Sequence, residues 1–528
     1  MPQVSSNQID PEILSQFGAP MESSNPSSSI KSGSIKPLTE LAPGTKLIVA
    51  GDRFVEVSPA LAKVFKAGDA LYAVAATGEV LHVPAATRRT VDDAVARARA
   101  AFRRMGAISD AQISEFFVQF SDRLSDDATW RRILEVNERD VAAAKLRGRS
   151  TTRLVATDTL RSGVVQGLRG WVSQSSQRGR VIERVQHEGW HADLVGAELG
   201  VVGFVFEGRP NVVADATGVL RGGNTVVFRI GRDALGTAKA MLEFALTPAL
   251  SAAGLPEGAV SLIDSPEHAA GWALFSNQNV SLAVARGSGP AVATLGALAQ
   301  QAGIPVSLHG TGGAWMCTSA TTDVQDFEES VVKSLDRKVC NTLNVCCILQ
   351  ERAQQLLPAF LRGLERAGAR RGQGYKLHVA QSSQQYVPSE LFTQKLNVRR
   401  AEGDVLEPRA ELLADGALGT EWEWEDTPEV SVVVVPSLDH AIELFNEHSP
   451  QFVATLVSAD ESEHQRFFQA VNAPFVGDGF TRWVDGQFAL RRPELGLANW
   501  EHGRLFGRGG VLSGDSVFTV RTRVTRER

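Results

Sequence analysis

The chain has 528 residues and carries 54 lysines and arginines against 60 aspartates and glutamates, so its net charge at pH 7 is −6. This length exceeds what a single hydrophobic core supports, and we expect at least two domains. The near balance of charge offers no basic stripe for a phosphate backbone, which argues against nucleic acid as a partner. No run of about 18 apolar residues occurs, so the sequence predicts no membrane span.

The cysteines and the N-terminus indicate the compartment. The chain has four cysteines, two of them adjacent at Cys346 and Cys347, which makes neither a disulfide framework nor a spaced zinc site. The first residues are polar and rich in serine, without the apolar segment of a signal peptide. We therefore expect a cytoplasmic protein with no metal site.

The N-terminal part divides into two segments. Residues 1–36 are rich in Ser, Asn, Gln and Pro, a composition that predicts disorder. Residues 37–88 contain short β-rich runs at 46–49 and 70–74 separated by glycine turns, which predicts a small β module. The module is either a packing element, the favoured interpretation, or an interaction element such as a docking site for a carrier protein.

Two helices are expected next. Apolar residues recur at helical spacing between Thr90, a suitable N-cap, and Met105. Ser109 and Gln112 then form the pattern of a capping box, which predicts the start of a second helix.

From residue 201 the pattern alternates between strand and helix. Apolar runs predict strands at 201–206, 225–230, 259–263 and 281–285, with a helix at 237–253 among the connections. Short apolar strands separated by helices predict a parallel sheet covered on both faces, as in dinucleotide-binding domains. A complete G-x-G-x-x-G is missing, and Gly287-Ser288-Gly289 is only a fragment of one.

A second lobe is expected from residue 303, with strands at 304–307, 314–317 and 345–349 and a helix at 324–337. Cys340 lies where this helix gives way to the last strand, and the cations Lys333, Arg337 and Lys338 precede it. Nearby positive charge favours a reactive thiolate, although a lone cysteine is more often a small buried residue. Cys317, Cys346 and Cys347 lie in apolar strands and are expected in the core.

Several motifs at characteristic distances carry a family resemblance. They are Glu207-Gly208-Arg209-Pro210-Asn211, Arg221-Gly222-Gly223-Asn224, residues 253–258 and 285–289, His309-Gly310-Thr311-Gly312, Val339-Cys340-Asn341-Thr342, Gly419-Thr420-Glu421-Trp422 and Thr481-Arg482. In this order they resemble the aldehyde dehydrogenase superfamily and, within it, the γ-glutamyl phosphate reductases (glutamate-5-semialdehyde dehydrogenases). The likeness runs from near Thr90 to the C-terminus.

The resemblance implies an α/β, aldehyde dehydrogenase-like fold with two Rossmann-like lobes, a small oligomerisation arm and an N-terminal β-rich extension. Residues 89–302, with parts of 470–528, would bind the cofactor, and residues 303–469 would form the catalytic cysteine domain. Residues 505–528 would form the arm of a homodimer or homotetramer, with the alternating run at 517–524 as an edge strand.

The resemblance also implies a mechanism. Cys340 would be the nucleophile that forms a thioester, and the side-chain amide of Asn211 with the backbone N–H of Cys340 or Asn341 would form the oxyanion hole. Many dehydrogenases of the superfamily place a glutamate base before a glycine pair, where this chain has Ser307-Leu308-His309-Gly310. The missing carboxylate favours a reductase over an enzyme that hydrolyses its thioester.

The cofactor expected from the resemblance is NADP(H), with NAD(H) as the alternative. Arg229 ends the strand that meets the adenosine ribose, and Arg232 follows three residues later. Two guanidinium groups would hold a 2′-phosphate, although Arg232 alternatively only faces solvent. Gly287, Ser288 and Glu421 complete the expected cofactor site, with Glu421 at the nicotinamide ribose.

Substrate contacts are expected from Arg209, His309 and Arg482. His309 is alternatively an acid or base, or a structural residue of its turn, and Arg482 alternatively caps a helix. The chain departs from the reductase pattern at Thr311, Asn344 and Phe506, which indicates a diverged paralogue with its own acyl substrate.

Three functions follow from these residues. The first is NADPH-dependent reduction of a small acyl phosphate, such as γ-glutamyl phosphate in proline biosynthesis or a relative in specialised metabolism. The second is reduction of an acyl thioester on coenzyme A or a carrier protein, docked through residues 37–88. The third, a scaffold without catalysis, is disfavoured by the intact Cys340.

Overall fold

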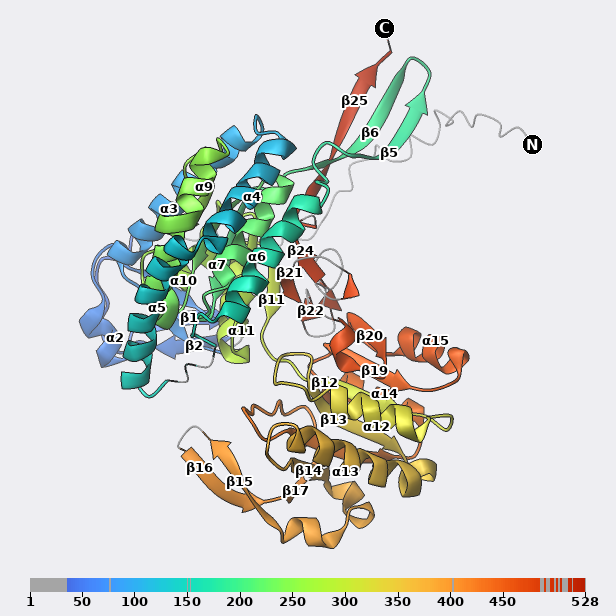
Figure 1. The fold of residues 1–528 in the computed structure, drawn as a ribbon. Helices are drawn as coiled ribbons and strands as arrows, with labels where there is room; N and C mark the ends of the chain where they lie inside the picture. Colours follow the sequence, from blue (N-terminus) through green and yellow to red (C-terminus); the bar gives the residue numbers. More distant parts are fainter. Residues whose placement is uncertain are drawn as a thin grey trace, which may run out of the picture.

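A computed structural model describes residues 36–75, 77–149, 151, 153–400 and 403–484, together with 489–490, 494–497, 500–501, 504–505, 511–514 and 516–527. The disorder expected for residues 1–36 and the position of Phe506 lie outside these ranges, apart from Lys36. Two α/β lobes and a projecting arm make up the molecule (Figure 1). Within the described residues, no helix is long and apolar enough to cross a membrane.

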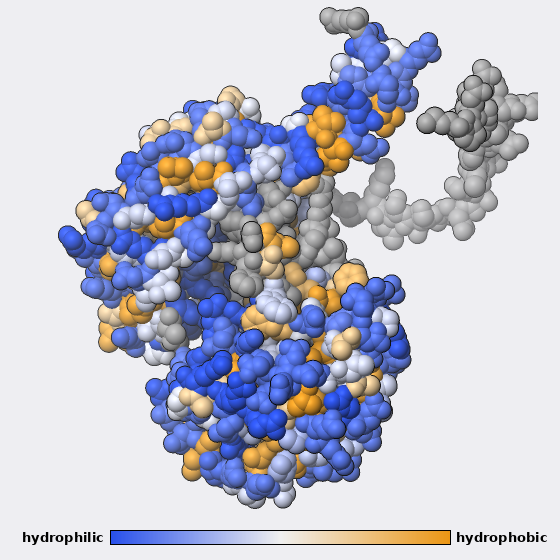
Figure 2. All heavy atoms as spheres, turned by 45° about the vertical axis from the view of Figure 1, so that its right-hand side comes forward, coloured by the Kyte–Doolittle hydropathy of each residue, from blue (hydrophilic) through white to orange (hydrophobic). Residues whose placement is uncertain are grey.

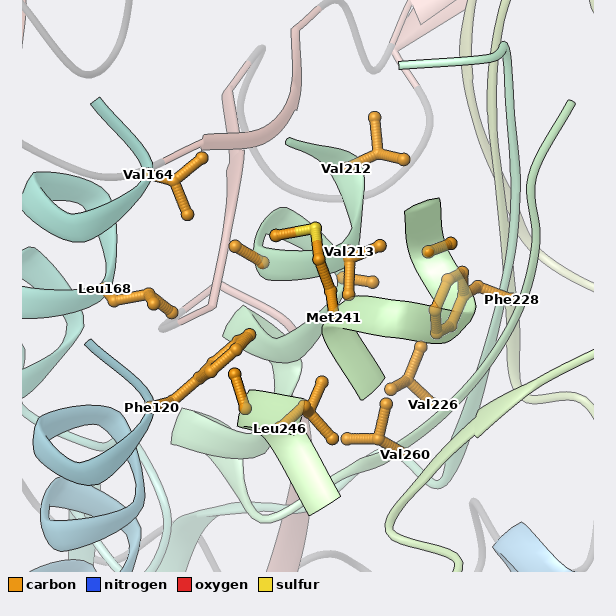
Figure 3. Close-up of a cluster of buried hydrophobic side chains, with 14 of the residues drawn as sticks. Phe120, Val164, Leu168, Val212, Val213, Val226, Phe228, Met241, Leu246 and Val260 are labelled. Carbon is orange, nitrogen blue, oxygen red and sulfur yellow. The ribbon is translucent and has the colours of Figure 1, made fainter. Parts of the chain in front are cut away.

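The first lobe contains a parallel five-stranded sheet in the order β11-β10-β7-β8-β9. Apolar residues of the central strand β7 point alternately to the two faces, and both faces are covered by helices, as expected. Figure 3 shows part of the core on one face, where Phe120, Leu168 and Phe228 converge. The strands are β7 (Val201–Phe206), β8 (Thr225–Arg229), β9 (Val260–Leu262), β10 (Leu282–Arg286) and β11 (Val306–His309).

Helices that precede the strands in the sequence and helices that connect them together cover the two faces of this sheet (Figure 1). One face carries α3 (Ala85–Met105), α10 (His268–Phe275) and α11 (Gly289–Gln301). The opposite face carries α4 (Asp110–Ser125), α5 (Asp127–Leu146), α6 (Asp158–Ser173), α7 (Val212–Thr217), α8 (Leu235–Met241) and α9 (Thr247–Ala252). The capping box of Ser109 and Gln112 is confirmed at the start of α4.

The expected N-cap at Thr90 is wrong, because α3 begins five residues earlier. The carboxylate of Asp69 accepts a hydrogen bond from the backbone N–H of Ala85 at 2.8 Å. The Asp69 carboxylate thus satisfies a backbone N–H group of the first helical turn. In most helices the side chain of the N-cap residue accepts such a hydrogen bond.

The β module contains two antiparallel hairpins, β1 (Lys46–Ala50) with β2 (Arg53–Glu56), and β3 (Ala70–Ala73) with β4 (Val80–Val83), joined through α2 (Pro59–Val64). Val74, Leu81 and Val83 are buried in one core with α3 and α10, so the second hairpin packs on the first lobe. The first hairpin leaves Ile48 and Phe54 exposed. Docking of a carrier protein through this module stays a prediction.

The second lobe contains a parallel seven-stranded sheet in the order β17-β14-β18-β13-β12-β19-β20. Cys317, Cys346 and Cys347 are fully buried in it, as expected. The strands are β12 (Ala314–Thr318), β13 (Leu343–Leu349), β14 (Lys376–Ala380), β17 (Ala410–Leu413), β18 (Glu429–Val435), β19 (Val453–Val457) and β20 (Phe475–Asp478). One face carries α12 (Val324–Lys333) and α13 (Ala353–Ala369), and the other carries α14 (Leu438–His448) and α15 (Glu461–Ala470).

The boundary between the lobes differs from the expected one. Strand β11 pairs with β10 in the first sheet, so residues 306–309 belong to the first lobe, and the second lobe begins after them. Strand β20 pairs with β19, so residues 475–478 belong to the second lobe. A hairpin of β15 (Lys395–Arg400) and β16 (Gly403–Pro408) projects from the second lobe (Figure 1).

The arm is a three-stranded antiparallel sheet in the order β25-β6-β5. It joins β5 (Val181–His187) and β6 (Trp190–Ala197) to β25 (Thr519–Arg526), so it includes a hairpin beyond the expected C-terminal segment. Asp193 is buried between Arg184 and Arg523, 2.6 and 2.8 Å away. The arm stands away from both lobes and is mostly hydrophilic (Figure 2). Its use in a homodimer or homotetramer stays a prediction.

Candidate active site

The strand order of the first lobe creates a crevice at one point of the sheet. The chain passes from β7 to β8 and β9 on one side, and then returns to β10 and β11 on the other. In open parallel sheets, ligands bind at the carboxyl ends of the strands where the order reverses in this way. Arg209 and Asn211 follow β7, Arg286 ends β10, and Gly287 and Ser288 follow it, so the topology brings these residues to one edge of the sheet.

Asn211 lies at the start of α7. Its amide donates a hydrogen bond to a carboxylate oxygen of Asp215 at 3.1 Å, and Nη1 of Arg286 lies 3.5 Å from the same oxygen. Burial raises the pKa of Asp215 to about 6, although Arg286 and Arg209 oppose the shift. A primary amide carries two N–H bonds, so the contact with Asp215 uses one of them.

Arg209 connects the crevice with the second lobe. It pairs with Glu207 at 2.5 Å, and its Nε is buried without a hydrogen-bond partner among the described residues. Burial lowers the pKa of Arg209, while the negative charges of Glu207 and Cys340 raise it. Arg209 therefore interacts electrostatically with Cys340 across the boundary between the lobes.

His309 ends β11 beside Arg286 in the strand register. Its ring packs 5.3 Å from that of Phe452, which belongs to a small apolar cluster of the second lobe against which Cys340 also packs. Burial lowers the pKa of His309 to about 3, and the positive charges of Arg286 and Arg209 contribute to the shift. His309 is therefore neutral at pH 7, which favours a hydrogen-bonding or structural role over proton transfer.

The turn that carries Cys340 follows α12 and is fixed by the backbone. The Cys340 carbonyl accepts a hydrogen bond from the N–H of Gly313 at 2.7 Å, and the carbonyl of the buried Asn341 accepts one from Thr481 at 2.8 Å. A side chain at Gly312 would lie 2.6 Å from the Cys340 carbonyl oxygen, so this close approach requires glycine.

A buried ion pair lies next to this turn. Nζ of Lys338 is 2.6 Å from one carboxylate oxygen of Glu421, and the other oxygen accepts the N–H of Gly312 at 2.7 Å. The Lys338 side chain is 5% exposed. Asn344, a position of departure from the reductase pattern, bonds to the backbone of Thr420 and Trp422 on either side of Glu421. The Lys338–Glu421 pair thus joins the cysteine turn to the loop after β11.

Arg482 lies in the short helix η8 (Thr481–Val484) beside the same turn. Its guanidinium is buried, and Nη1 is 3.7 Å from a carboxylate oxygen of Asp336. The backbone N–H of the neighbouring Thr481 donates a hydrogen bond to the hydroxyl of Ser334 at 3.1 Å. The expected substrate residue Arg482 therefore lies near the nucleophile turn.

A group of cations surrounds the carboxyl end of β8. Arg229 is buried, donates to the carbonyl of Pro266 at 2.8 Å, and keeps a buried Nε without a partner in the described part of the chain. Burial lowers the pKa of His268, and the charges of Arg229, Arg232 and Arg149 lower it further. Excess positive charge with unused N–H donors fits a phosphate group such as the 2′-phosphate of NADP(H).

Gly287 and Ser288 lie between β10 and α11. The N–H of Gly287 donates to the His309 carbonyl at 3.2 Å, which fixes the loop against β11. Ser288 is the N-cap residue of α11, and its hydroxyl makes no capping hydrogen bond. The open start of this helix at the crevice fits the negative charge of a dinucleotide.

The structure thus gathers Cys340, Asn341, Arg209, His309, Glu421 and Arg482 where the lobes meet, whereas Arg229 and Arg232 lie at a separate strand end. Sequence reasoning assigned no role to Arg286 or Asp215. Arg286 stands inside the motif at 285–289, which was a usable signal. Asp215 lies on the helix after Asn211, and no signal in the sequence marks it.

The aldehyde dehydrogenase family model matches residues 71–368, more than half of the chain. The chain therefore belongs to the aldehyde dehydrogenase family, and the predicted family and fold are confirmed. It is an oxidoreductase of the superfamily that uses NAD(P).

Within the family, the chain resembles γ-glutamyl phosphate reductases. It is 26% identical to that of Syntrophomonas wolfei, over 76% of this chain and 90% of the relative. It is 27% identical to that of Nitrobacter winogradskyi, over 82% and 95%. The solved γ-glutamyl phosphate reductase of Thermotoga maritima superposes with a TM-score of 0.71 at 20% identity, covering 83% of this chain and 99% of that one.

Proposed function

We propose that the chain reduces an acyl phosphate, γ-glutamyl phosphate or a related compound, to the semialdehyde through a thioester on Cys340, with NADPH as the reductant. The observation that carries this proposal is the position of the Cys340 turn. Cys340 packs against the cluster that contains Phe452, and the ring of Phe452 lies 5.3 Å from that of His309 at the end of β11, so the turn lies against the first sheet. Covalent reduction requires this approach of nucleophile and cofactor site.

Each candidate site residue has a separate role in the proposed reaction. The Cys340 thiolate attacks the acyl carbon, an S–C bond forms, the C–O bond to phosphate breaks, and inorganic phosphate leaves. Asn211 and the backbone N–H of Cys340 or Asn341 stabilise the oxyanion. NADPH, when bound, supplies the hydride that reduces the acyl carbon. The Cys340 S–C bond then breaks, which releases the aldehyde and restores the thiolate.

The charges near Cys340 favour phosphate as the leaving group. Arg209 and Arg286 both act on His309 and Asp215, so two guanidinium groups share this space. Arginine matches the geometry of phosphate oxygens and stabilises their negative charge. His309, with a pKa of about 3, is neutral and adds no cation here.

For the cofactor, we propose that Arg229 and Arg232 bind the 2′-phosphate of NADP(H). We also propose that Gly287 and Ser288 contact the dinucleotide in the crevice. Glu421 is held by Lys338 and Gly312, which uses two of about four lone-pair positions on its carboxylate. A contact with the nicotinamide ribose would use the others. We propose that Arg482 meets the substrate near Cys340.

A second candidate is reduction of an acyl thioester carried by coenzyme A or a carrier protein. The observation in its favour is the first hairpin of the β module, where Ile48 and Phe54 are paired across the strands and 79% and 50% exposed. An exposed apolar pair of this kind suits a protein partner.

The test measures NADPH oxidation with an acyl phosphate and with the matching coenzyme A thioester. We expect turnover with the phosphate and none in Cys340→Ala. Cys317→Ala, which alters a buried thiol outside the site, is the matched control and should retain turnover. Equal rates in Cys340→Ala and the unaltered enzyme would refute the nucleophile, and turnover with only the thioester would favour the second candidate.

A further inference from the structure

Asn211 and Asp215 lie on the same face of α7. The backbone N–H of Asp215 donates to the carbonyl of Asn211 at 3.2 Å, so the two side chains are about one helical turn apart. Asparagine is a common N-cap residue, yet the Asn211 side chain makes no capping hydrogen bond. Its amide donates instead to the carboxylate of Asp215 at 3.1 Å. The Asn211 amide is therefore oriented by Asp215 and not by the start of the helix.

The charge of Asp215 determines which end of this amide faces it. An ionised carboxylate only accepts hydrogen bonds, whereas a primary amide has a donating nitrogen and an accepting oxygen. If the Asn211 amide were flipped, two acceptors would meet, so the flipped orientation is disfavoured. A protonated carboxyl group, or an amide at position 215, both donates and accepts and would permit either orientation.

Arg286 holds Asp215 in its ionised form. Nη1 of Arg286, at the end of β10, lies 3.5 Å from the carboxylate oxygen that accepts the Asn211 amide. Burial raises the pKa of Asp215 to about 6, whereas the charges of Arg286 and Arg209 lower it. Asp215 also faces α6 across a cavity, and none of the other described residues that line this cavity carries a charge. Asp215 is therefore mostly ionised at pH 7 and becomes protonated as the pH falls below 6.

The pair of Asn211 and Asp215 lies on the side of the first lobe that faces the cysteine turn. Arg209, two residues before Asn211, interacts electrostatically with both Asp215 and Cys340. The contact with Asp215 uses one N–H of the Asn211 amide and leaves the second for an oxyanion. In the flipped orientation, an oxygen would meet that oxyanion and repel it.

We propose that Asp215 is a positioning residue for the reaction: its carboxylate, held by Arg286, fixes the Asn211 amide with an N–H toward the oxyanion formed at Cys340. This inference rests on the proposed function, because that function places the oxyanion at Asn211. Asp215 acts through Asn211 and not on the acyl group itself. Asp215→Asn should therefore lower kcat for the acyl phosphate roughly tenfold and leave its KM within about twofold.

The first experiment compares two reactions of Cys340 that differ in the oxyanion. Acylation by p-nitrophenyl acetate forms an S–C bond through a tetrahedral oxyanion and releases p-nitrophenolate, whereas alkylation by iodoacetamide is a direct displacement without one. Asp215→Asn should slow acylation roughly tenfold and leave alkylation within about twofold, after subtraction of the rates in Cys340→Ala. Equal slowing of both reactions would overturn the inference. So would an unaltered enzyme that p-nitrophenyl acetate fails to acylate at Cys340.

A double variant tests whether Asp215 acts through Asn211. Asn211→Ala should slow acylation roughly 100-fold, and adding Asp215→Asn should slow it by less than about twofold more, because the amide is already gone. Asp122→Asn is the matched control, since this aspartate of α4 pairs with Arg169 at 3.5 Å on the surface, and it should change neither reaction. Unchanged acylation in Asn211→Ala, or a further tenfold loss in the double variant, would contradict the inference.

The pH dependence gives a readout that a merely structural Asp215 would not produce. Each acylation rate is divided by the alkylation rate at the same pH, which removes the contribution of Cys340 ionisation. The unaltered enzyme should exceed Asp215→Asn roughly tenfold at pH 8 and only about twofold at pH 5, because about one tenth of Asp215 is ionised there. His309, with a pKa of about 3, stays neutral throughout this range. The same ratio at both pH values would refute the role of the Asp215 charge.

These measurements separate the inference from the proposed function, because p-nitrophenyl acetate requires neither NADPH nor an acyl phosphate. If the unaltered enzyme reduces no acyl phosphate, the proposed function fails, and the acylation rates still decide the role of Asp215. If acyl phosphates are reduced and Asp215→Asn retains full kcat, the proposed function holds and the positioning role fails.

Discussion

The Lys338–Glu421 pair provides a prediction that separates a structural role of Glu421 from a purely cofactor-binding one. Lys338→Met leaves the Glu421 carboxylate, 16% exposed, with its hydrogen bond from the Gly312 N–H. Removing one partner of a buried ion pair costs about 3–5 kcal/mol, and the residual exposure of Glu421 favours the lower value of about 3 kcal/mol. Glu421→Gln leaves the Lys338 ammonium with the exposed carboxylate of Glu423, 3.8 Å away, and should cost about 2–3 kcal/mol.

The double variant removes both charges together. Its loss of stability should therefore be smaller than the sum of the two single losses, by about 2 kcal/mol or more. Urea unfolding of the four proteins measures this coupling. Additive losses would refute the ion pair as an anchor of the cysteine turn.

Labelling of Cys340 with iodoacetamide at pH 7 gives a second, independent measurement. Lys338→Met removes a nearby cation and should slow labelling, whereas Glu421→Gln leaves that cation unbalanced and should accelerate it, each roughly threefold. Three of the four thiols are fully buried, so the reaction reports on Cys340. If the labelling rate changed in the same direction in both variants, the electrostatic argument would be contradicted.

Three further predictions follow from single positions. His309, with its pKa lowered from 6.5 to about 3, stays neutral in the fold and charges in the unfolded chain, so stability is lost as the pH falls below 6.5. Between pH 7 and pH 5 the free energy of unfolding should fall by about 2 kcal/mol because of His309. In His309→Asn, urea unfolding should show a fall that is smaller by about 2 kcal/mol. Arg232→Ala should raise the KM for NADPH roughly tenfold and leave that for NADH unchanged in steady-state kinetics. Gly167→Ala should stabilise the protein by about 0.5–1 kcal/mol in thermal unfolding, since its Cβ meets no neighbour.

Much of the fold follows from local patterns, and the errors have physical causes. The buried strand at 201–206 was predicted with its observed limits, because an apolar run between glycine-rich turns leaves little choice. The N-cap at Thr90 failed because Asp69, 16 residues from Ala85, serves the helix start. The strand at 306–309 was expected in the second lobe, since periodicity does not specify which sheet a strand joins.

The site was predictable only where a motif marks it. Cys340 stands out through the motifs around it, and in the structure it packs against the Phe452 cluster that contacts His309 of the first lobe. The Lys338–Glu421 pair joins residues 83 positions apart, and Arg286 meets Asp215 through the sheet topology. Such contacts depend on how strands are ordered in space, which local sequence patterns do not contain.

The strand order of the arm determines when the arm can fold during synthesis. Asp193 lies on β6, in the hairpin with β5, and its ion pair with Arg523 forms only after 330 more residues have been made. During synthesis at about 5–20 residues per second, β5 and β6 are therefore without their third strand for roughly 20–60 s. Throughout that interval the edge of β6 is open to pairing with other nascent chains, so misassembly through the arm is favoured until β25 has been made.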